Sequence, residues 1–213
     1  AVRVAASKQA TARRLAAQGM PVVPTLALAE IAHWPDGPLV IKPDDGAGCE
    51  GAAIIRDPAQ RPDASAHAKL VMQPLLTGEA LSLSAIFAQG QARLLCVNRQ
   101  MIEQTATGFR LQGCQVNAYA DPGRHWQTLA EGVARALPDL WGYAGIDLIL
   151  TSDGPVILEI NPRLTTSYAA IHAATGENPA AAVLELLRTG QLPNPRPHLG
   201  QPVDIRLGQS HGG

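Results

Sequence analysis

Apolar and polar residues alternate through the middle of the chain, which is the pattern of half-buried β-strands. Between residues 80 and 88, Leu81, Leu83 and Phe87 fall on one face of an extended chain and two serines fall on the other, because successive side chains of a strand point to opposite sides. Similar runs, separated by turn residues, predict further strands. The predicted strands cover residues 38–42, 52–55, 69–76, 80–88, 92–103, 109–118, 146–150 and 156–160.

Helical spacing is confined to a few segments. Trp126, Leu129 and Val133 recur at the period of an amphipathic helix. Ser7 can cap a helix near the N-terminus, and Gly19 can end it. The predicted helices cover residues 8–18, 27–33, 124–137 and 178–188, and the proline-containing tail that follows is expected to be irregular.

The order of these elements favours an α+β fold. A helix precedes a hairpin at residues 38–55, and consecutive antiparallel strands, a second helix, another hairpin and a last helix follow. Strands and helices do not alternate as they would in a parallel sheet with crossover helices. A boundary near residues 76–78 predicts an N-terminal lobe over residues 1–76 and a C-terminal lobe over residues 77–213.

Composition and charge exclude several classes of protein. Of the 213 residues, 46% are hydrophobic and 16% are charged, which is typical of a soluble globular enzyme. A formal net charge of -1 gives no electrostatic case for binding nucleic acid or an anionic membrane, and no apolar run is long enough to span a bilayer. The cysteines Cys49, Cys96 and Cys114 are odd in number and lack metal-ligand spacing, which favours a reducing, cytoplasmic location.

The N-terminal segment allows two interpretations. Arg13 and Arg14 precede the first acidic residue, Glu30, as they would in a transit peptide. The segment fits better as a helix that supplies a ligand-binding lysine, because the chain has only three lysines and Lys8 is one of them.

A glycine-rich segment follows the predicted strand at residues 38–42. Gly46, Gly48 and Gly51 would let the backbone approach a ligand closely, and its N–H groups could hold phosphate oxygens. Lys42, directly before this segment, would add a positive charge. The segment lacks the Gly-Lys-Ser/Thr signature and the following helix of the common phosphate-binding loop. A plain hairpin loop is therefore the simpler interpretation of these residues alone.

Acidic residues interrupt the apolar runs of the last predicted hairpin. Asp147 lies on one strand and Glu159 and Asn161 on the other, and a turn at residues 152–154 would bring Asp147 near Glu159. Two carboxylates and an amide oxygen are ligands that suit Mg²⁺. Because a buried carboxylate needs a partner, ordinary cross-strand pairing, an ion pair with Arg163 or a solvated strand end are the alternatives.

Four motifs that extend in order over nearly the whole chain resemble the ATP-grasp superfamily. They are Ser7-Lys8-Gln9 with Gly19-Met20-Pro21-Val22, Leu39-Val40-Ile41-Lys42-Pro43 with the glycine-rich segment, Val71-Met72-Gln73-Pro74-Leu75-Leu76-Thr77-Gly78-Glu79, and Asp147 with Glu159-Ile160-Asn161-Pro162-Arg163. Asn98-Arg99-Gln100 and the segment from Glu159 to Tyr168 most resemble the branch of this superfamily that includes tyramine–L-glutamate ligase.

The resemblance implies an ATP-grasp fold, in which two lobes of antiparallel sheets and helices enclose a nucleotide cleft. It implies ATP with Mg²⁺ (or Mn²⁺), and a ligase that joins a small carboxylate to an amine through an acyl phosphate. Arg163 would face the γ-phosphate or the substrate carboxylate, Lys42 would act with it in catalysis, and the metal ligands would be Asp147, Glu159 and Asn161. The implied nucleotide contacts are Lys8, Lys42, Gly46, Gly48, Gln73, the carbonyl of Pro74, the N–H of Leu76, and Glu79.

Two departures from the family pattern affect what the resemblance implies. The family often has a second acid after the hinge glycine to hold the ribose, whereas Ala80 follows Glu79 here. The α/β domain that usually precedes the nucleotide-binding part is expected to be absent. Glutamate and an aromatic amine are candidate substrates, and a homodimer is a candidate assembly. A non-catalytic nucleotide-binding or regulatory module and a small-molecule kinase are the alternative functions.

Overall fold

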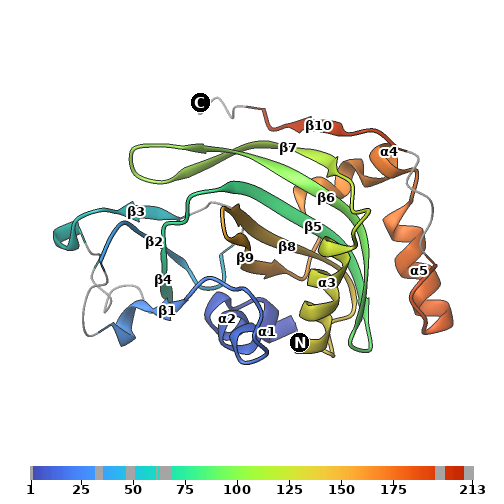
Figure 1. Cartoon of the computed structure of the whole chain (residues 1–213), viewed down its shortest axis with the longest axis horizontal. Helices are drawn as coiled ribbons and strands as arrows, with labels where there is room; N and C mark the ends of the chain where they lie inside the picture. The colour runs from blue at the N-terminus through green and yellow to red at the C-terminus, as the bar shows by residue number, and fades with distance from the viewer. Residues whose placement is uncertain are drawn as a thin grey trace.

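The computed structural model of the chain describes residues 2–31, 36–46, 51–60, 62, 69–194 and 200–208. Two antiparallel β-sheets and a few helices form an α+β fold, as the order of elements predicts (Figure 1). The elements in chain order are α1 (Val2–Ala5), α2 (Lys8–Ala16), β1 (Leu26–Ala27), η1 (Leu28–Glu30), β2 (Leu39–Pro43), β3 (Ala53–Ile55), η2 (Pro58–Gln60), β4 (Leu70–Pro74), β5 (Glu79–Ala88), β6 (Gln91–Gln104), β7 (Phe109–Tyr119), α3 (His125–Ala136), β8 (Gly142–Thr151), β9 (Gly154–Asn161), η3 (Thr166–Ala170), α4 (Ile171–Thr175), α5 (Pro179–Thr189) and β10 (Val203–Arg206), where η marks a 3₁₀ helix.

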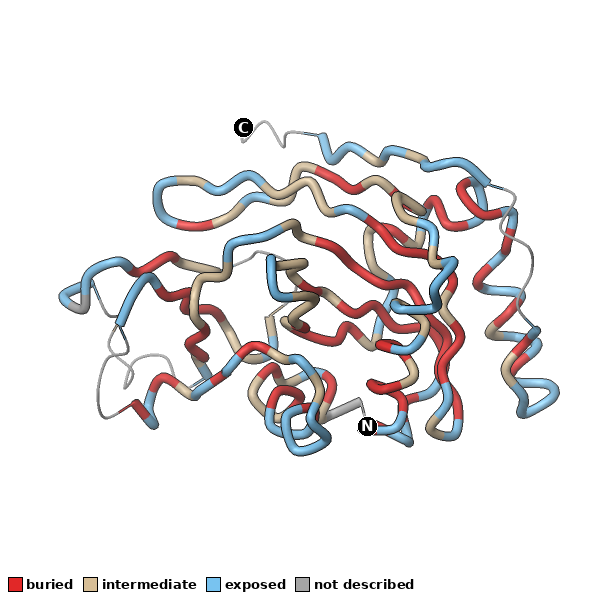
Figure 2. Tube along the Cα trace, viewed as in Figure 1, coloured by how far each residue is buried: buried red, intermediate tan, exposed pale blue. Residues whose placement is uncertain are grey.

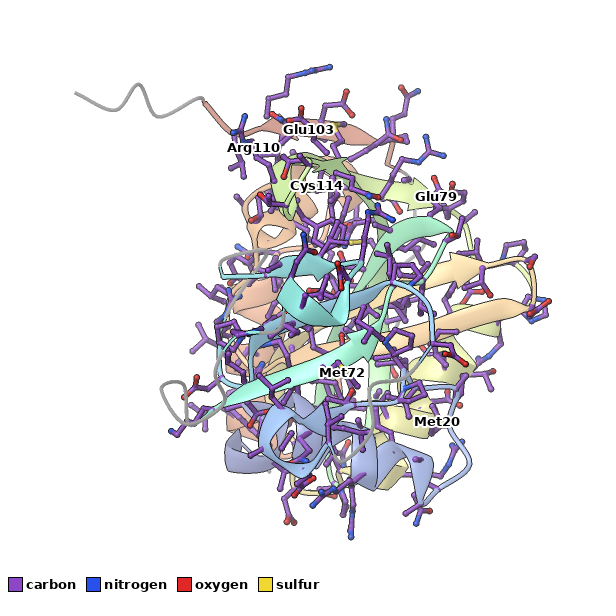
Figure 3. The ribbon with its side chains drawn as sticks, turned by 90° about the vertical axis from the view of Figure 1, so that its left-hand side faces the viewer. Met20, Met72, Glu79, Glu103, Arg110 and Cys114 are labelled. Carbon is purple, nitrogen blue, oxygen red and sulfur yellow. The ribbon has the colours of Figure 1, made fainter. Side chains whose placement is uncertain are left out.

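The first sheet is small, with its strands in the order β1-β4-β2-β3. Strand β2 pairs with β3 on one side and β4 on the other, so that Val40 lies opposite both Ile54 and Gln73. The predicted hairpin of β2 and β3 is therefore confirmed. The apolar side chains of this sheet form a core of their own that includes Met72, which Figure 3 labels on β4.

The second sheet is larger, with the order β10-β7-β6-β5-β8-β9, and each strand is antiparallel to its neighbours. Helix α3 covers one face, and α4 and α5 cover the other (Figure 1). The predicted alternation along β5 is confirmed, because Leu81, Leu83 and Phe87 are fully buried on the α3 side while Ile86 packs on the α5 side. Figure 2 shows the buried residues concentrated along the central strands of this sheet.

The N-terminal segment is attached to the edge of the large sheet. The N–H of Val23 donates to the carbonyl of Ile157 at 2.9 Å, and the N–H of Ile157 donates to the carbonyl of Pro21 at 2.8 Å. Helix α2, which Ser7 caps as predicted, packs against β9. Although α2 precedes the small sheet in the sequence, it therefore lies against the large one.

The two sheets also meet at the tip of the β6–β7 hairpin. The N–H of Ile54 on β3 donates to the carbonyl of Thr107 at 2.9 Å, and Ala53 forms an antiparallel bridge with Gly108. Glycine at position 108 permits this approach, because a Cβ there would collide with the carbonyl oxygen of Ala52. The small sheet is thus joined to the large one by this contact as well as by the chain between β4 and β5.

Two predictions about minor elements are wrong. The helix expected over residues 27–33 is only the short η1 turn within the described part of the chain, which leaves out residues 32 and 33. The tail expected to be irregular adds β10 to the large sheet, where Ile205 lies opposite Cys114. Gly113 allows this pairing, because a Cβ there would collide with the carbonyl of Ile205. Across the residues described, no helix is both long and apolar enough to cross a bilayer.

Candidate active site

A cavity of about 290 Å³ lies between the two sheets. Its size is near the lower end of the range for small-molecule sites, which is about 300–1,000 Å³. One part of its wall is apolar and the other part carries lysine, carboxylate and amide groups. The lining residues are Val40, Lys42, Ala52, Gln73, Pro74, Leu75, Leu76, Gly78, Ala80, Gln100, Ile102, Gln104, Phe109, Leu111, Asp147, Ile149, Leu158 and Glu159.

Glu159 is the centre of the charged part of this wall. Its Oε2 atom lies 3.4 Å from the Nζ of Lys8 on α2 and 3.4 Å from the Nζ of Lys42 on β2. All three side chains are buried. Buried charges are costly unless they are paired, and here two ammonium groups share one carboxylate. Two ammonium groups therefore lie beside the cavity with Glu159 as their shared ion partner.

The pKa of Lys42 reflects its burial and its charged neighbours. Burial lowers the pKa of Lys42 below its ordinary value, because removal from water disfavours the charged ammonium group. The carboxylate of Glu159 opposes this shift, and the charge of Lys8 adds to it. An anionic ligand in the cavity would relieve the repulsion between the two lysines, so this part of the wall suits an anion.

Asp147 faces Glu159 across the β8–β9 pair, as the sequence predicts. Its Oδ1 accepts a hydrogen bond from the Nε2 of Gln100 at 3.0 Å, and its Oδ2 accepts one from the Nδ2 of Asn161 at 2.9 Å. Burial, together with the neighbouring charge of Glu159, raises the pKa of Asp147 to about 7. The charge of Glu159 thus disfavours the ionised form of Asp147.

The donor set around Asp147 fits a divalent cation. Asp147, Glu159 and Asn161 offer two carboxylates and an amide oxygen on paired strands, and oxygen is the ligand that Mg²⁺ prefers. A cation there would favour the ionised form of Asp147, which the structure otherwise disfavours. Among the described residues, no group of three or more His, Cys, Asp or Glu side chains is arranged as a metal site. Any cation at this position would therefore complete its coordination with other oxygens.

Arg163 lies at the exposed end of the same strand. Its Nη1 donates to the carbonyl of Leu164 at 3.0 Å and its Nη2 donates to the Oδ1 of Asn161 at 3.4 Å. Glu159, by contrast, has the two lysines as ion partners. The alternative in which Arg163 neutralises that carboxylate is therefore not what the structure shows.

A second, smaller cavity of about 60 Å³ adjoins the acidic end of the first. Gln100 and Asp147 line both cavities and so stand between them. The lining residues of the smaller cavity are Ser82, Gln100, Leu111, Cys114, Asp147, Asn161, Arg163, Thr165, Thr166 and Ser167.

A network of hydroxyl groups holds the turn that lines this smaller cavity. The Oγ1 of Thr165 is 2.7 Å from the hydroxyl of Tyr143 and 3.0 Å from the Oγ of Ser167. Ser84 on β5 lies 3.2 Å from Ser167, and the fully buried Asn98 donates to Ser84 at 3.1 Å. Buried polar groups that satisfy each other in this way stiffen a site. Sequence reasoning missed this network, although serine and asparagine within apolar strands were its signal.

The hinge between the sheets contributes backbone and apolar groups to the larger cavity. Gln73, Pro74 and Leu76 line it, as predicted. The side chain of Gln73 already has a structural role, because its Nε2 donates to the Oγ1 of Thr25 at 2.9 Å. Gly78 follows the hinge, and a Cβ there would collide with the carbonyl of Leu150, which explains the glycine.

The structure does not bring Glu79 to the cavity wall. Gly78 and Ala80 line the cavity instead. The carboxylate of Glu79, labelled in Figure 3, forms an ion pair with Arg99 and accepts a hydrogen bond from the hydroxyl of Tyr119 at 2.7 Å. The predicted ribose contact of Glu79 therefore has no support from this geometry.

The glycine-rich segment is described only in part. The carbonyl of Gly46 accepts a hydrogen bond from the Nζ of Lys8 at 2.6 Å, which ties the beginning of the segment to the charged cluster. Gly48, predicted to contact phosphate, lies outside the described residues.

Two antiparallel sheets that enclose a cavity, with lysines and carboxylates gathered at one end, define the ATP-grasp class of fold. The chain belongs to the ATP-grasp family, because its residues 5–167 match the ATP-grasp domain. Tyramine–L-glutamate ligase of Methanocaldococcus jannaschii is 33% identical to it over 114 residues, which cover 54% of this chain and 34% of that protein. The matched part of the chain therefore covers about a third of the length of this relative.

Solved structures share the fold at low sequence identity. L-amino acid ligase from Bacillus licheniformis superposes with a TM-score of 0.72 at 20% identity, covering 86% of this chain and 48% of that one. A putative ATP-grasp superfamily protein from Archaeoglobus fulgidus gives 0.63 at 24% identity, with coverage of 97% and 65%. The biotin carboxylase domain of Hydrogenobacter thermophilus 2-oxoglutarate carboxylase, solved with MgADP, gives 0.70 at 14% identity, with coverage of 94% and 49%.

Proposed function

We propose that the chain binds Mg·ATP in the cavity between the sheets and uses it to join a small carboxylate to an amine. The observation that carries this proposal is the convergence of Lys8 and Lys42 on Glu159, opposite Asp147, at one end of that cavity. Two buried ammonium groups beside two carboxylates suit a polyphosphate with its metal ion. Membership of the ATP-grasp family and the ligase names of the relatives support the same conclusion.

In this proposal the adenine ring occupies the apolar end of the cavity. Val40, Leu75 and Leu158 line it there and would contact the faces of the ring. The carbonyl of Pro74 and the N–H of Leu76 would bind its polar edge, since backbone groups of a hinge offer one acceptor and one donor side by side. The phosphates would then extend toward Lys42 and Lys8.

The proposed reaction has two steps, phosphoryl transfer and amide formation. An oxygen of the substrate carboxylate attacks the γ-phosphorus of ATP, the bond to the bridging oxygen breaks, and ADP leaves. The nitrogen of the amine then attacks the acyl carbon of the acyl phosphate, inorganic phosphate leaves, and the nitrogen gives up a proton. These steps need positioning and charge neutralisation more than side-chain acid–base chemistry.

The residues of this chain divide that work by position. The ammonium groups of Lys8 and Lys42 would neutralise the phosphates, and the guanidinium of Arg163, at the mouth of the smaller cavity, would meet the γ-phosphate or the attacking carboxylate. Asp147, Glu159 and Asn161 would hold Mg²⁺, which neutralises charge on the phosphate oxygens when it is bound. Removing one preorganised charge contact of this kind typically lowers the rate by about 10²–10³.

The names of the relatives suggest the substrates. One is a ligase of tyramine and L-glutamate and another is an L-amino acid ligase. We therefore propose an amino acid, with glutamate first, as the carboxylate, and an aromatic amine as its acceptor. The described cysteines, Cys96 and Cys114, are free thiols, which agrees with the proposed cytoplasmic location.

The test is release of ADP from Mg·ATP with a panel of amino acids and amines, followed by mass spectrometry of the products. The proposal predicts ADP release that needs the carboxylate, and an amide that forms only when the amine is also present. Hydroxylamine should replace the amine and give an acyl hydroxamate. A kinase would instead accumulate a stable phosphorylated product, and nucleotide binding without ADP release under any of these conditions would contradict the proposed activity.

A further inference from the structure

The first turn of α2 is bound to the end of strand β2. The N–H of Lys8 donates to the carbonyl of Asp44 at 3.1 Å, and the N–H of Gln9 donates to the Oδ1 of Asp44 at 2.8 Å. The next N–H, of Ala10, donates to the Oγ of Ser7 at 3.1 Å. The N–H groups at the start of a helix have no partners within it. Here Asp44, which follows the last residue of β2, supplies partners for two of them.

The same contacts fix where the side chain of Lys8 can go. Its Nζ donates to the carbonyl of Gly46 at 2.6 Å and lies 3.4 Å from both the carbonyl of Asp44 and the Oε2 of Glu159. Lys8 is only 5% exposed. A lysine side chain is long and flexible and can adopt many rotamers. The placement of the Lys8 ammonium therefore depends on how the first turn of α2 is held against the end of β2.

Asp44 also connects parts of the molecule that belong to different sheets. Strand β2 is in the small sheet, whereas α2 packs against β9 of the large one. The N–H of Asp44 donates to the carbonyl of Lys69 at 2.8 Å, which holds the aspartate backbone beside β4. Among the described residues that line the two cavities, Asp44 is absent. Whatever Asp44 does for the site, it does through another residue.

We propose that Asp44 is a positioning residue for nucleotide binding. By accepting from Gln9 it fixes the first turn of α2, and it thereby holds the ammonium of Lys8 against Glu159 and next to the phosphate end of the cavity. Asp44 also links the β2–β3 hairpin to Lys8, so that the distance between the hairpin and the charged cluster stays fixed. This inference rests on the proposed binding of Mg·ATP in the cavity.

The competing interpretation is that Asp44 merely caps a helix and stabilises the fold. Ser7 provides the matched control, because it caps the adjacent N–H of the same helix and makes no described side-chain contact with Lys8 or the hairpin. Losing either cap should destabilise the protein to a similar extent. Only the loss of Asp44 should change the position of Lys8.

The experiment measures Mg·ATP affinity by calorimetry, beside a melting curve, for the wild type, Asp44→Ala, Asp44→Asn and Ser7→Ala. Asp44→Ala should weaken binding about tenfold, the size of one lost hydrogen bond to a positioned group. Asp44→Asn should bind within about twofold of the wild type, because its amide oxygen can accept from Gln9. Ser7→Ala should melt at a lower temperature and bind normally. Asp44→Ser, whose side chain is shorter, replaces Asp44→Ala if that variant does not fold.

A double-mutant cycle with Lys8→Met identifies the residue through which Asp44 acts. If Asp44 positions Lys8, then adding Asp44→Ala to Lys8→Met should cause no further loss of affinity. Additive losses, equal binding by the wild type and Asp44→Ala, or an equal loss in Ser7→Ala would each overturn the inference while leaving the proposed function intact. A wild type that binds no Mg·ATP would overturn the proposed function, and the inference with it.

Discussion

Two buried glutamates, Glu159 and Glu177, are each paired with a cation, but their surroundings differ. Both are almost fully buried, at 6% exposure each. Glu159 has two lysines at 3.4 Å and borders the cavity between the sheets. Glu177 forms one close ion pair with Arg93, on the far face of the large sheet. The comparison distinguishes charged residues that border a cavity from charged residues that pair with each other away from it.

Arg93 has several partners within the protein itself. The Nη1 of Arg93 donates to the carbonyls of Pro193 and Asn194 at 3.0 and 3.1 Å, while its Nη2 pairs with Glu177. These contacts tie β6 to the turn before α5 and to the segment after it. One positive charge meets one negative charge, and two backbone carbonyls accept hydrogen bonds from the same guanidinium.

The Glu159 cluster, in contrast, has two cations on one carboxylate and longer contacts. Two lysines meet one carboxylate, and the nearby Asp147 has its pKa raised to about 7 by burial and by Glu159. Lys42, Glu159 and Asp147 of this cluster border the cavity between the sheets. Burial of a charge therefore does not by itself mark a functional site, whereas several interacting charges beside a cavity indicate one.

The largest effect is expected on stability, from Glu177→Gln. This change leaves Arg93 as a buried charge without its carboxylate, which typically lowers the free energy of unfolding by about 3–5 kcal/mol. Mg·ATP affinity, measured on protein that is still folded at low temperature, should not change. Urea unfolding and calorimetry on the same preparation check both parts. A fall in affinity that parallels the loss of stability would break the distinction between the two clusters.

Lys42→Met should instead lower affinity without lowering stability, because it keeps the apolar stem of the side chain and removes its charge. Affinity for Mg·ATP should fall about tenfold, which corresponds to about 1.4 kcal/mol. The free energy of unfolding should hold or rise, because Lys8 still pairs with Glu159 and a buried ammonium is no longer repelled by its neighbour. Lys69→Met is the control, since Lys69 pairs with Asp45 at an exposed position. Equal affinities for the two variants would remove Lys42 from the binding site.

A smaller, pH-dependent effect should come from Asp147 in the absence of metal and nucleotide. Its pKa is about 7 in the folded protein and its ordinary value is 3.8. The folded state therefore binds the proton more tightly, so the stability linked to this group is present below about pH 4 and lost as the pH rises through about 7. Urea unfolding at pH 5 and pH 8 should show this loss in the wild type and less of it in Asp147→Asn. A pH dependence that the substitution leaves unchanged would assign it to another group.

Local patterns were sufficient to predict strands β2 to β9 and helix α3, because alternation and helical spacing record which faces are buried. The register of Asp147 opposite Glu159 followed in the same way from a short turn between two apolar runs. Strand β10 could not be predicted so easily, because several prolines precede Val203 and the pairing depends on Gly113, which is far away in the sequence.

The partners of the site residues were harder to predict than the residues themselves. The sequence suggested Lys8 and Lys42 but not that both would contact Glu159, since α2, β2 and β9 meet only in the folded chain. The same reason applies to Glu79, whose position next to the hinge suggested a ligand contact. Its strand directs the side chain to Arg99 and Tyr119 instead.

The central claim is that the acids facing the cavity form a metal-dependent nucleotide site. The most direct measurement is Mg·ATP affinity as a function of Mg²⁺ concentration, by calorimetry, for the wild type and Glu159→Gln, with a melting curve for each. The account predicts that Glu159→Gln, which keeps the shape of the side chain and removes one charge, shifts the Mg²⁺ midpoint at least tenfold higher while the protein stays folded. A lower melting temperature with an unchanged Mg²⁺ midpoint would show that Glu159 only pairs with its lysines, and would contradict the account.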